Sequence, residues 1–180
     1  MISETHALEI ALRQATEDLT FRLEDIEPLE KGWFFPWRMT KPVEYTAEGV
    51  PWNVPVGSNG IIVNKETGST FALGSAYSVE RDKKFYDLGY QSKSYDLVIL
   101  SISDPSETLN TLESLQLRRI DVSYEAGTVW RIPKVIQSRE LEECLDELPC
   151  IFTDQVLYFR LERLHEAGEL GHFEFRALGR

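Results

Sequence analysis

The three histidines and the 30 acidic residues are the side chains with which this sequence could build a catalytic or metal-binding site. No two of His6, His165 and His172 have the i, i+4 spacing that places two metal ligands on one helix face. Adjacent carboxylates such as Glu24/Asp25 are frequent, but hydrolysis requires two carboxylates that face each other across a cleft. In so acidic a chain, adjacent pairs are expected on solvated faces. The sequence therefore predicts no metal, no cofactor and no enzymatic activity.

The two cysteines and the apolar segments bear on the compartment. Cys144 and Cys150 match no redox or zinc spacing, so we expect both as reduced thiols in the core. The first residues carry neither the basic nor the apolar region of a signal peptide. Leu97–Leu100 is the longest apolar stretch, far short of the roughly 20 residues that a membrane span needs. We expect a cytoplasmic protein without membrane contact.

The net charge of −11 is spread along the chain. Residues 1–92 hold 14 acids and 9 bases, and residues 93–180 hold 16 acids and 10 bases, which gives −5 and −6. A nucleic-acid-binding protein is expected to carry a basic stripe, and none is present. The helix–turn–helix–strand pattern of 138–177 is similar to a winged helix, but its excess of acids would repel phosphates. We expect no nucleic-acid partner; the acidic surface either serves solubility or steers a basic partner.

The aromatic residues of 33–52 are the most distinctive feature of the sequence. Trp33, Phe35 and Trp37 share one face of a predicted strand, and Phe34 lies on the other. At least one face is core. The other face, or the loop that carries Tyr45 and Trp52, is a candidate binding surface, because tryptophan and tyrosine are favoured anchors at interfaces.

Helical and alternating patterns are interspersed, and the strands come as two hairpins. Helices are predicted over 3–19, 78–88, 104–115, 138–148 and 153–168, with caps at Ser3, Ser78, Asp104, Ser138 and Thr153 and a final glycine at Gly168. Strands are predicted over 20–28, 33–37, 60–63, 69–73, 95–102, 120–124, 129–132 and 171–177, with a long loop over 40–58. The pattern predicts an α+β fold: antiparallel sheet from two hairpins, flanked by helices.

Residues 5–90 carry a family resemblance. Gly32-Trp33-Phe34-Phe35, the hairpin 60–68 and Phe71–Ala76 resemble the YrhB-like family, also called immunity protein 35, with its "G-W-x-F", "V-x-x-x-T-G" and "L-G-S/T-A" motifs. The resemblance implies a bacterial protein that neutralises a cognate toxin, and a related member is described as chaperone-like. It implies an immunity domain over residues 1–92. Residues 93–180 match nothing in that family and form an α+β region, either separate or packed on the same sheet.

These observations lead to one expected function and two alternatives. We expect an immunity protein that binds its toxin through an acidic, aromatic-bearing surface. Its predicted contact residues come from the 40–58 loop and from the helix after the hairpin: Glu44, Tyr45, Glu48, Trp52, Asp82, Tyr86, Asp87 and Tyr90. The first alternative is a chaperone-like or general protein-interaction module without catalysis. The second is an enzyme with a catalytic cleft formed across the two halves of the chain, which would hold carboxylates of perturbed pKa. The oligomeric state is not predicted.

Overall fold

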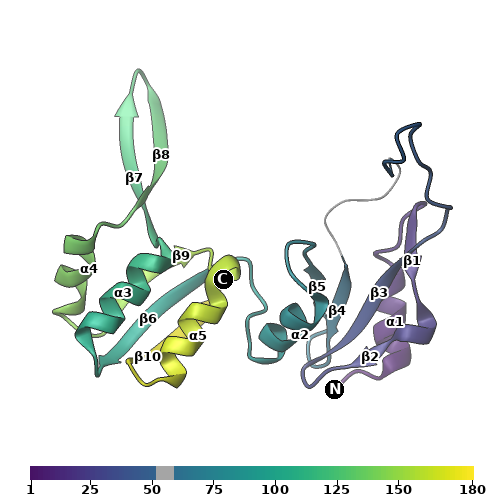
Figure 1. The fold of residues 1–180 in the computed structure, drawn as a ribbon, viewed down its shortest axis with the longest axis horizontal. Coiled ribbons are helices and arrows are strands. Elements are labelled where there is room, and N and C mark those ends of the chain that lie inside the picture. Colours follow the sequence, from purple (N-terminus) through teal and green to yellow (C-terminus); the bar gives the residue numbers. More distant parts are fainter. Residues whose placement is uncertain (52–58) are drawn as a thin grey trace. The chain divides into compact units, whose positions relative to one another are not determined.

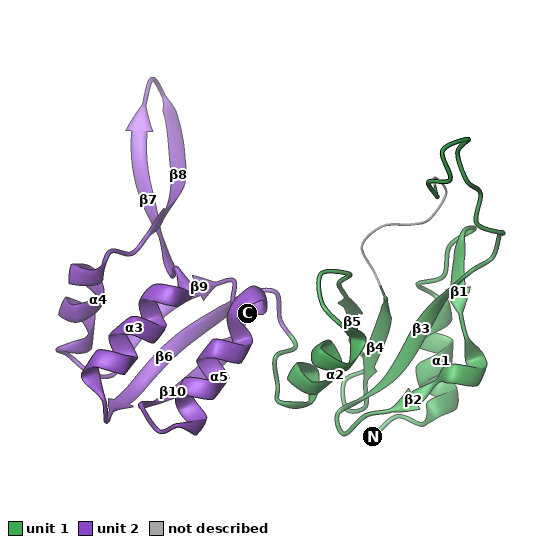
Figure 2. Cartoon of the chain, in the orientation of Figure 1, with its two compact units in different colours: residues 1–91 green, residues 92–180 purple. Residues whose placement is uncertain are grey.

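The structure, a computed structural model, describes residues 1–51 and 59–180 and consists of helices and antiparallel strands, which confirms the α+β prediction. The chain forms two compact units, Met1–Gln91 and Ser92–Arg180 (Figures 1 and 2). Among the described strands, each pairs with strands of its own unit.

Unit 1 is an antiparallel sheet with a helix on each face. Its elements are α1 (Glu4–Leu12), β1 (Leu19–Phe21), a 3-10 turn (Leu23–Asp25), β2 (Glu27–Pro28), β3 (Gly32–Met39), β4 (Gly60–Asn64), β5 (Thr70–Leu73) and α2 (Val79–Asp87). The strand order is β1-β3-β4-β5, and β2 also pairs with β3. Every residue of β4 is buried, because Ile61 and Val63 face the core under α1 while Ile62 faces Tyr86 of α2.

The segment between α1 and β3 differs from the predicted helix and strand. The helix begins at the Ser3 cap as predicted but ends at Leu12 rather than at residue 19. The Thr16 hydroxyl accepts hydrogen bonds from the amides of Asp18 and Leu19, and this local turn competes with the helix. Residues 20–28 are not one strand but two short ones, separated by the 3-10 turn, that pair with different parts of β3.

Unit 2 has a three-stranded sheet and a separate two-stranded ribbon. Its elements are β6 (Tyr95–Ile102), α3 (Pro105–Leu115), β7 (Arg118–Glu125), β8 (Thr128–Val135), α4 (Ser138–Leu145), β9 (Cys150–Gln155), a 3-10 turn (Tyr158–Arg160), α5 (Leu161–Glu169) and β10 (Phe173–Gly179). The sheet order is β10-β6-β9, and α3 packs against α4 and α5. Tyr95, Leu97 and Ile99 alternate into the core, as expected for a sheet with one covered face.

The C-terminal helix begins later than predicted. Thr153 is not its cap, since Cys150–Gln155 form β9, where the buried Phe152 lies opposite Leu97 of β6. Helix α5 begins at Leu161, and Val156, which the predicted helix 153–168 would include, lies before it and is exposed. Gly168 lies inside α5 against the ring of Phe175, where a Cβ would sit 2.7 Å from that ring. The left-handed residue after the helix is Gly171, with φ of +74°.

The prediction of two reduced cysteines is wrong. Cys144 near the end of α4 and Cys150 at the start of β9 form a disulfide, and neither is a free thiol. Pro149 lies between them, in the bend that leads from the end of α4 at Leu145 to β9. This short covalent link fixes α4 to the edge of the sheet.

Candidate functional site

The best-exposed cluster of predicted contact residues lies in the tip loop, which we define as residues 43–51 (Figure 1). Its backbone closes on itself, since the Thr46 amide donates to the Val50 carbonyl at 2.8 Å and the Gly49 amide donates to the Thr46 carbonyl at 2.9 Å. Tyr45 and Pro51 form an isolated antiparallel bridge. Gly49 has a φ of +78°, a left-handed conformation that glycine adopts readily. The loop is therefore an ordered turn that holds its side chains in place.

The base of the tip loop is anchored to the chain before β1. The Thr40 amide and hydroxyl donate to the carbonyls of Asp18 and Glu17 at 3.1 and 2.6 Å. The Lys41 ammonium lies 2.8 Å from the Asp18 carboxylate, and this hydrogen bond and ion pair raise the pKa of Lys41. Lys41 is thus engaged mainly with Asp18 outside the loop, and Glu44 contributes a smaller electrostatic interaction from within it.

The tip loop presents carboxylates beside apolar side chains. Glu44 and Glu48 are exposed, and Tyr45 is 63% exposed. The Thr46 hydroxyl bonds the Glu48 carboxylate and lowers the pKa of Glu48, which keeps it ionised at neutral pH. Val43 and Val50 are also exposed in this loop, and the sequence did not single them out. Trp52, the remaining predicted contact in the loop, lies outside the described residues.

The predicted contacts on α2 require correction. Asp82, Tyr86 and Tyr90 are 3%, 1% and 9% exposed, so they cannot form an outer docking surface in this fold. Asp82 and Tyr86 are four residues apart on one face of α2, and Tyr86 packs on the sheet. Tyr90 lies beyond the end of the helix and packs against Phe85. Leu88, at the end of the predicted helix 78–88, is exposed. The helix turns its aromatic side inward because that side supplies the second core of unit 1.

Asp87 has a structural role rather than an outward one. Its carboxylate accepts hydrogen bonds from the amides of Glu30 and Lys31 at 3.1 and 2.9 Å, and so ties the end of α2 to the turn before β3. Beside it, the buried Lys83 pairs with Glu27 at 2.6 Å and Glu80 at 2.8 Å. Burial opposes the charge of Lys83, but the two glutamates outweigh it and raise the pKa. These groups join α2 to the sheet.

The aromatic residues of β3 are mainly core. Phe34 and Phe35 are buried on opposite faces of the strand. Trp37 stacks on Phe21 with ring centroids 4.2 Å apart, and Trp33 packs in the same core as Phe35. The exposed tryptophan of the described residues is instead Trp130 on β8, which is 53% exposed. The alternating sequence around Trp130 predicted a strand, but it did not indicate that the hairpin would be exposed.

A catalytic site would require a cavity together with a metal site or with a carboxyl group of raised pKa. A cavity of about 400 Å³ in unit 1 is lined by Met1, Glu30, Lys31, Asn64, Lys65, Glu66, Gly89 and Gln91. Among residues 1–51 and 59–180, no cluster of three or more histidine, cysteine or acidic side chains could hold a metal, and no helix is long and apolar enough to cross a membrane. Hydrogen-bond donors lower the pKa values of Asp96 and Asp121, opposite to the shift that a general acid requires.

The comparisons with known proteins add no relative to this description. No family model matches the chain, and neither a curated protein nor a solved structure matches it. The YrhB-like resemblance of residues 5–90 therefore stays a prediction from the sequence motifs.

Proposed function

We propose that this protein is an immunity protein that binds and neutralises a cognate bacterial toxin, with the tip loop as its docking site. The observation that carries the proposal is the ordered, exposed turn that places Tyr45 between Glu44 and Glu48, flanked by Val43 and Val50. The family resemblance in the sequence supports the same function. The contact residues that we predicted on α2 are not part of the proposed surface.

The tip loop suits inhibition by occlusion. Tyr45 supplies a large contact area with few rotatable bonds, which is typical of an interface anchor. The two carboxylates complement a basic cleft in the toxin and increase the rate of association. Because the Thr46 and Gly49 hydrogen bonds already order the turn, little conformational entropy is lost on binding. In this mechanism the protein acts by binding and turns over no substrate.

The test is a co-expression assay with the toxin domain encoded beside the protein's own gene. The wild-type protein should restore growth and bind the purified toxin domain, and Tyr45→Ala should weaken binding by about tenfold or more. Glu44→Lys/Glu48→Lys should slow association by about tenfold or more at low salt. The matched control is Glu9→Lys/Glu66→Lys, which changes the net charge equally at exposed positions elsewhere in unit 1. Equal effects of the two double variants would contradict the tip loop as the docking site, and absence of rescue would contradict the function.

The cytoplasmic location predicted from the sequence belongs to the same proposal, and the disulfide makes it testable. Cytoplasmic reductants hold such cysteines as thiols, whereas an oxidising compartment preserves the bond between Cys144 and Cys150. Thiol trapping in intact cells that express the protein natively distinguishes the two. Modification of both cysteines supports the cytoplasm, and protection of both contradicts it.

The chaperone-like alternative has one observation in its favour. The β7–β8 ribbon exposes Val122, Tyr124, Val129 and Trp130, the kind of apolar surface that captures unfolded chains. This function predicts that the protein suppresses light scattering by several unrelated proteins as they unfold, with little dependence on salt. The immunity function predicts no such suppression.

A further inference from the structure

The β7–β8 ribbon, called the arm below (Arg118–Val135), is an antiparallel hairpin without a covering layer in unit 2 (Figure 1). Every residue of the two strands is exposed except Asp121, which is half-buried. Ile120, Val122 and Tyr124 are 49%, 66% and 74% exposed. A two-stranded ribbon alone in water is marginally stable, so an apolar arm of this length is expected to pair with something.

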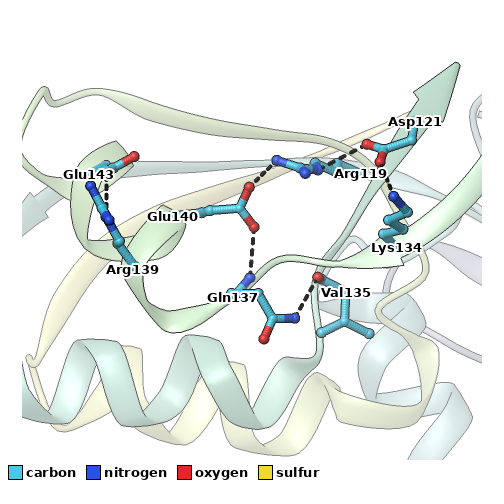
Figure 3. A network of polar contacts seen from close by, with 8 residues as sticks. All are labelled: Arg119, Asp121, Lys134, Val135, Gln137, Arg139, Glu140 and Glu143. Atoms are coloured by element: carbon cyan, nitrogen blue, oxygen red, sulfur yellow. Dashed lines mark hydrogen bonds and ion pairs between the residues drawn. The ribbon is translucent and has the colours of Figure 1, made fainter.

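The base of the arm is held firmly, so that its direction from unit 2 is fixed (Figure 3). Arg119 contacts both Asp121 and Glu140 of α4, and Lys134 lies 2.6 Å from Asp121. The Lys134 hydrogen bond, with Arg119 nearby, lowers the pKa of Asp121 and keeps the network charged. The Glu140 carboxylate also accepts the Gln137 amide at 3.0 Å at the start of α4. These contacts lie on one face of the arm and leave the face of Val122 open.

The ladder defines which backbone groups of β7 point away from β8. The Ile136 amide donates to the Leu117 carbonyl at 2.9 Å, so this pair is hydrogen-bonded across the ribbon. Bonded and non-bonded pairs alternate in an antiparallel ladder. Ile120, Val122 and Tyr124 therefore direct their N–H and C=O groups to the outer edge.

The backbone hydrogen bonds of Arg118 agree with this alternation. Its amide donates to Gln155 Oε1 at 2.8 Å, and Gln155 Nε2 donates to its carbonyl at 2.7 Å. The Gln155 side chain thus occupies the outer edge of β7 at the base of the arm, as a neighbouring strand would. Beyond Arg118, the outer edge of β7 is open to pairing at the next three outward residues, Ile120, Val122 and Tyr124.

The two edges of the arm are not equivalent. Pro133 lies opposite Ile120 in the ladder, at an outward position of β8, and proline has no N–H to donate there. The β8 edge is thereby blocked, in the way that natural sheets protect their edges. The outer edge of β7 has no proline and no lysine, and carries the strand-forming residues Ile120, Val122 and Tyr124.

We propose that the arm is a self-association site in which the β7 edges of two copies pair antiparallel and form a four-stranded sheet, β8-β7-β7-β8. With Val122 opposite the partner's Val122, Ile120 lies opposite the partner's Tyr124 in both directions. The outward backbone groups then meet in the register that an antiparallel ladder requires. The side chains of these residues join, with Val129, into one apolar patch on a single face.

Charges on the opposite face favour a second copy over an arbitrary strand. The same register places Arg119 opposite the partner's Glu125, and Asp121 opposite the partner's Ser123. Opposite charges thus face each other at both ends of the pairing, and no like charges are opposed. Oppositely charged cross-strand pairs stabilise a sheet, whereas like charges destabilise it. The β7 strand of a second copy of this chain is therefore a suitable partner for β7.

Sedimentation velocity of the full-length protein over a concentration series tests the pairing. The wild type is expected to convert from monomer to dimer, and added salt should not weaken the dimer, since each copy carries a charge of −11. Binding by the tip loop is expected to weaken with salt, so the two interactions can be distinguished. A wild type that stays monomeric at every concentration would overturn the proposal, whether another protein or another segment covers the arm.

Two proline variants separate the edges. Val122→Pro removes an N–H that points away from β8, so the hairpin keeps its own ladder, and the dimer should weaken about tenfold or more for the two hydrogen bonds lost. The matched control, Arg131→Pro, changes the outward residue directly opposite on β8 and should leave dimerisation within about twofold. Equal dimerisation of Val122→Pro and wild type would overturn the proposal.

Cysteine cross-linking tests the register and does not depend on proline tolerance. The protein has no free thiol, so Val122→Cys introduces a single one that lies opposite its own copy across the pair. Mild oxidation should give a covalent dimer. Val129→Cys, similarly exposed but on β8, would sit roughly 20 Å from its copy, three strand spacings across the sheet and about four residues along it, and should remain uncoupled. Cross-linking of Val129→Cys as fast as Val122→Cys would overturn the register and with it the proposal.

Discussion

The two hairpins of this protein have similar local sequences and opposite surroundings. The β4–β5 hairpin turns at Asn64–Gly68, and the β7–β8 hairpin turns at Ala126-Gly127, where both residues have positive φ. Each has strand-forming residues on both sides of its turn. Yet all of β4 is buried between two helices, whereas nearly all of β7 is exposed. Turn chemistry specifies that a hairpin forms, but the rest of the chain decides whether it is covered.

The largest difference is expected when one apolar side chain is shortened in each hairpin. Ile62→Ala leaves a cavity between β4 and α2 and should lower the free energy of unfolding of unit 1 by about 3–5 kcal/mol. Val122→Ala should change the stability of the monomer by less than about 0.5 kcal/mol, because its side chain has little to lose. Urea denaturation at low protein concentration measures both. Comparable losses would show that the arm is covered in solution.

The disulfide of unit 2 is expected to have the next largest effect. Cys144→Ser/Cys150→Ser opens a loop with a sequence separation of 6, and the chain-entropy relation gives about 2 kcal/mol for so short a loop. Amide hydrogen exchange should show the loss in β9 and α4, with the core of β4 unchanged as the internal control. An equal loss of protection in β4 would contradict the assignment of the effect to unit 2.

The Asp87 side chain distinguishes a structural from a docking role on α2. Asp87→Ala removes the acceptor of two backbone amides and should lower the stability of unit 1 by about 1–2 kcal/mol. Asp87→Asn keeps one carbonyl acceptor and should lose less. Thermal unfolding measures the two variants, and toxin binding by their folded forms should equal that of wild type. Weaker toxin binding without loss of stability would show that α2 is part of the docking surface.

How far the sequence predicts this fold is clear from particular residues. Caps at Ser3, Ser78 and Asp104 mark helix starts correctly, because each side chain bonds an amide within its own first turn. The β9 strand was missed because its pairing with β6 joins residues more than fifty positions apart. The disulfide was missed because a spacing does not report whether α4 and β9 bring two sulfurs together.

The candidate site was predicted in part for the same reason. Glu44, Tyr45 and Glu48 lie in an exposed turn, as expected of a polar loop rich in proline and glycine. Tyr86 and Tyr90 were assigned to the surface from residue type alone, although Tyr86 is on the packed side of α2 with Asp82, and Tyr90 is buried against Phe85 just after the helix. Exposure of the arm depends on which elements fail to cover it, and no local pattern encodes that.

The smallest expected effect is a gradual loss of stability at alkaline pH in unit 1. Burial raises the pKa of Tyr86, and the pKa of Lys83 is raised because Glu27 and Glu80 outweigh its burial. Both folded pKa values lie above the unfolded ones, so the stabilisation is complete below the ordinary values of 10.0 and 10.5 and is lost as pH rises through the folded values. Urea midpoints measured across this range should fall less steeply in Tyr86→Phe. The same decline in the wild type and in Tyr86→Phe would show that Tyr86 is not its cause.

Pro133 has a consequence for how far sheets built on this protein can grow. A ribbon with two open edges would add strands without limit, and ordered fibres arise in that way. Here β8, the strand behind the open edge, contains a proline that offers no hydrogen at its outward position. Strand addition through the arm is therefore expected to stop after a single partner has been added. A protein with an open strand edge of this kind can then remain in solution as a dimer.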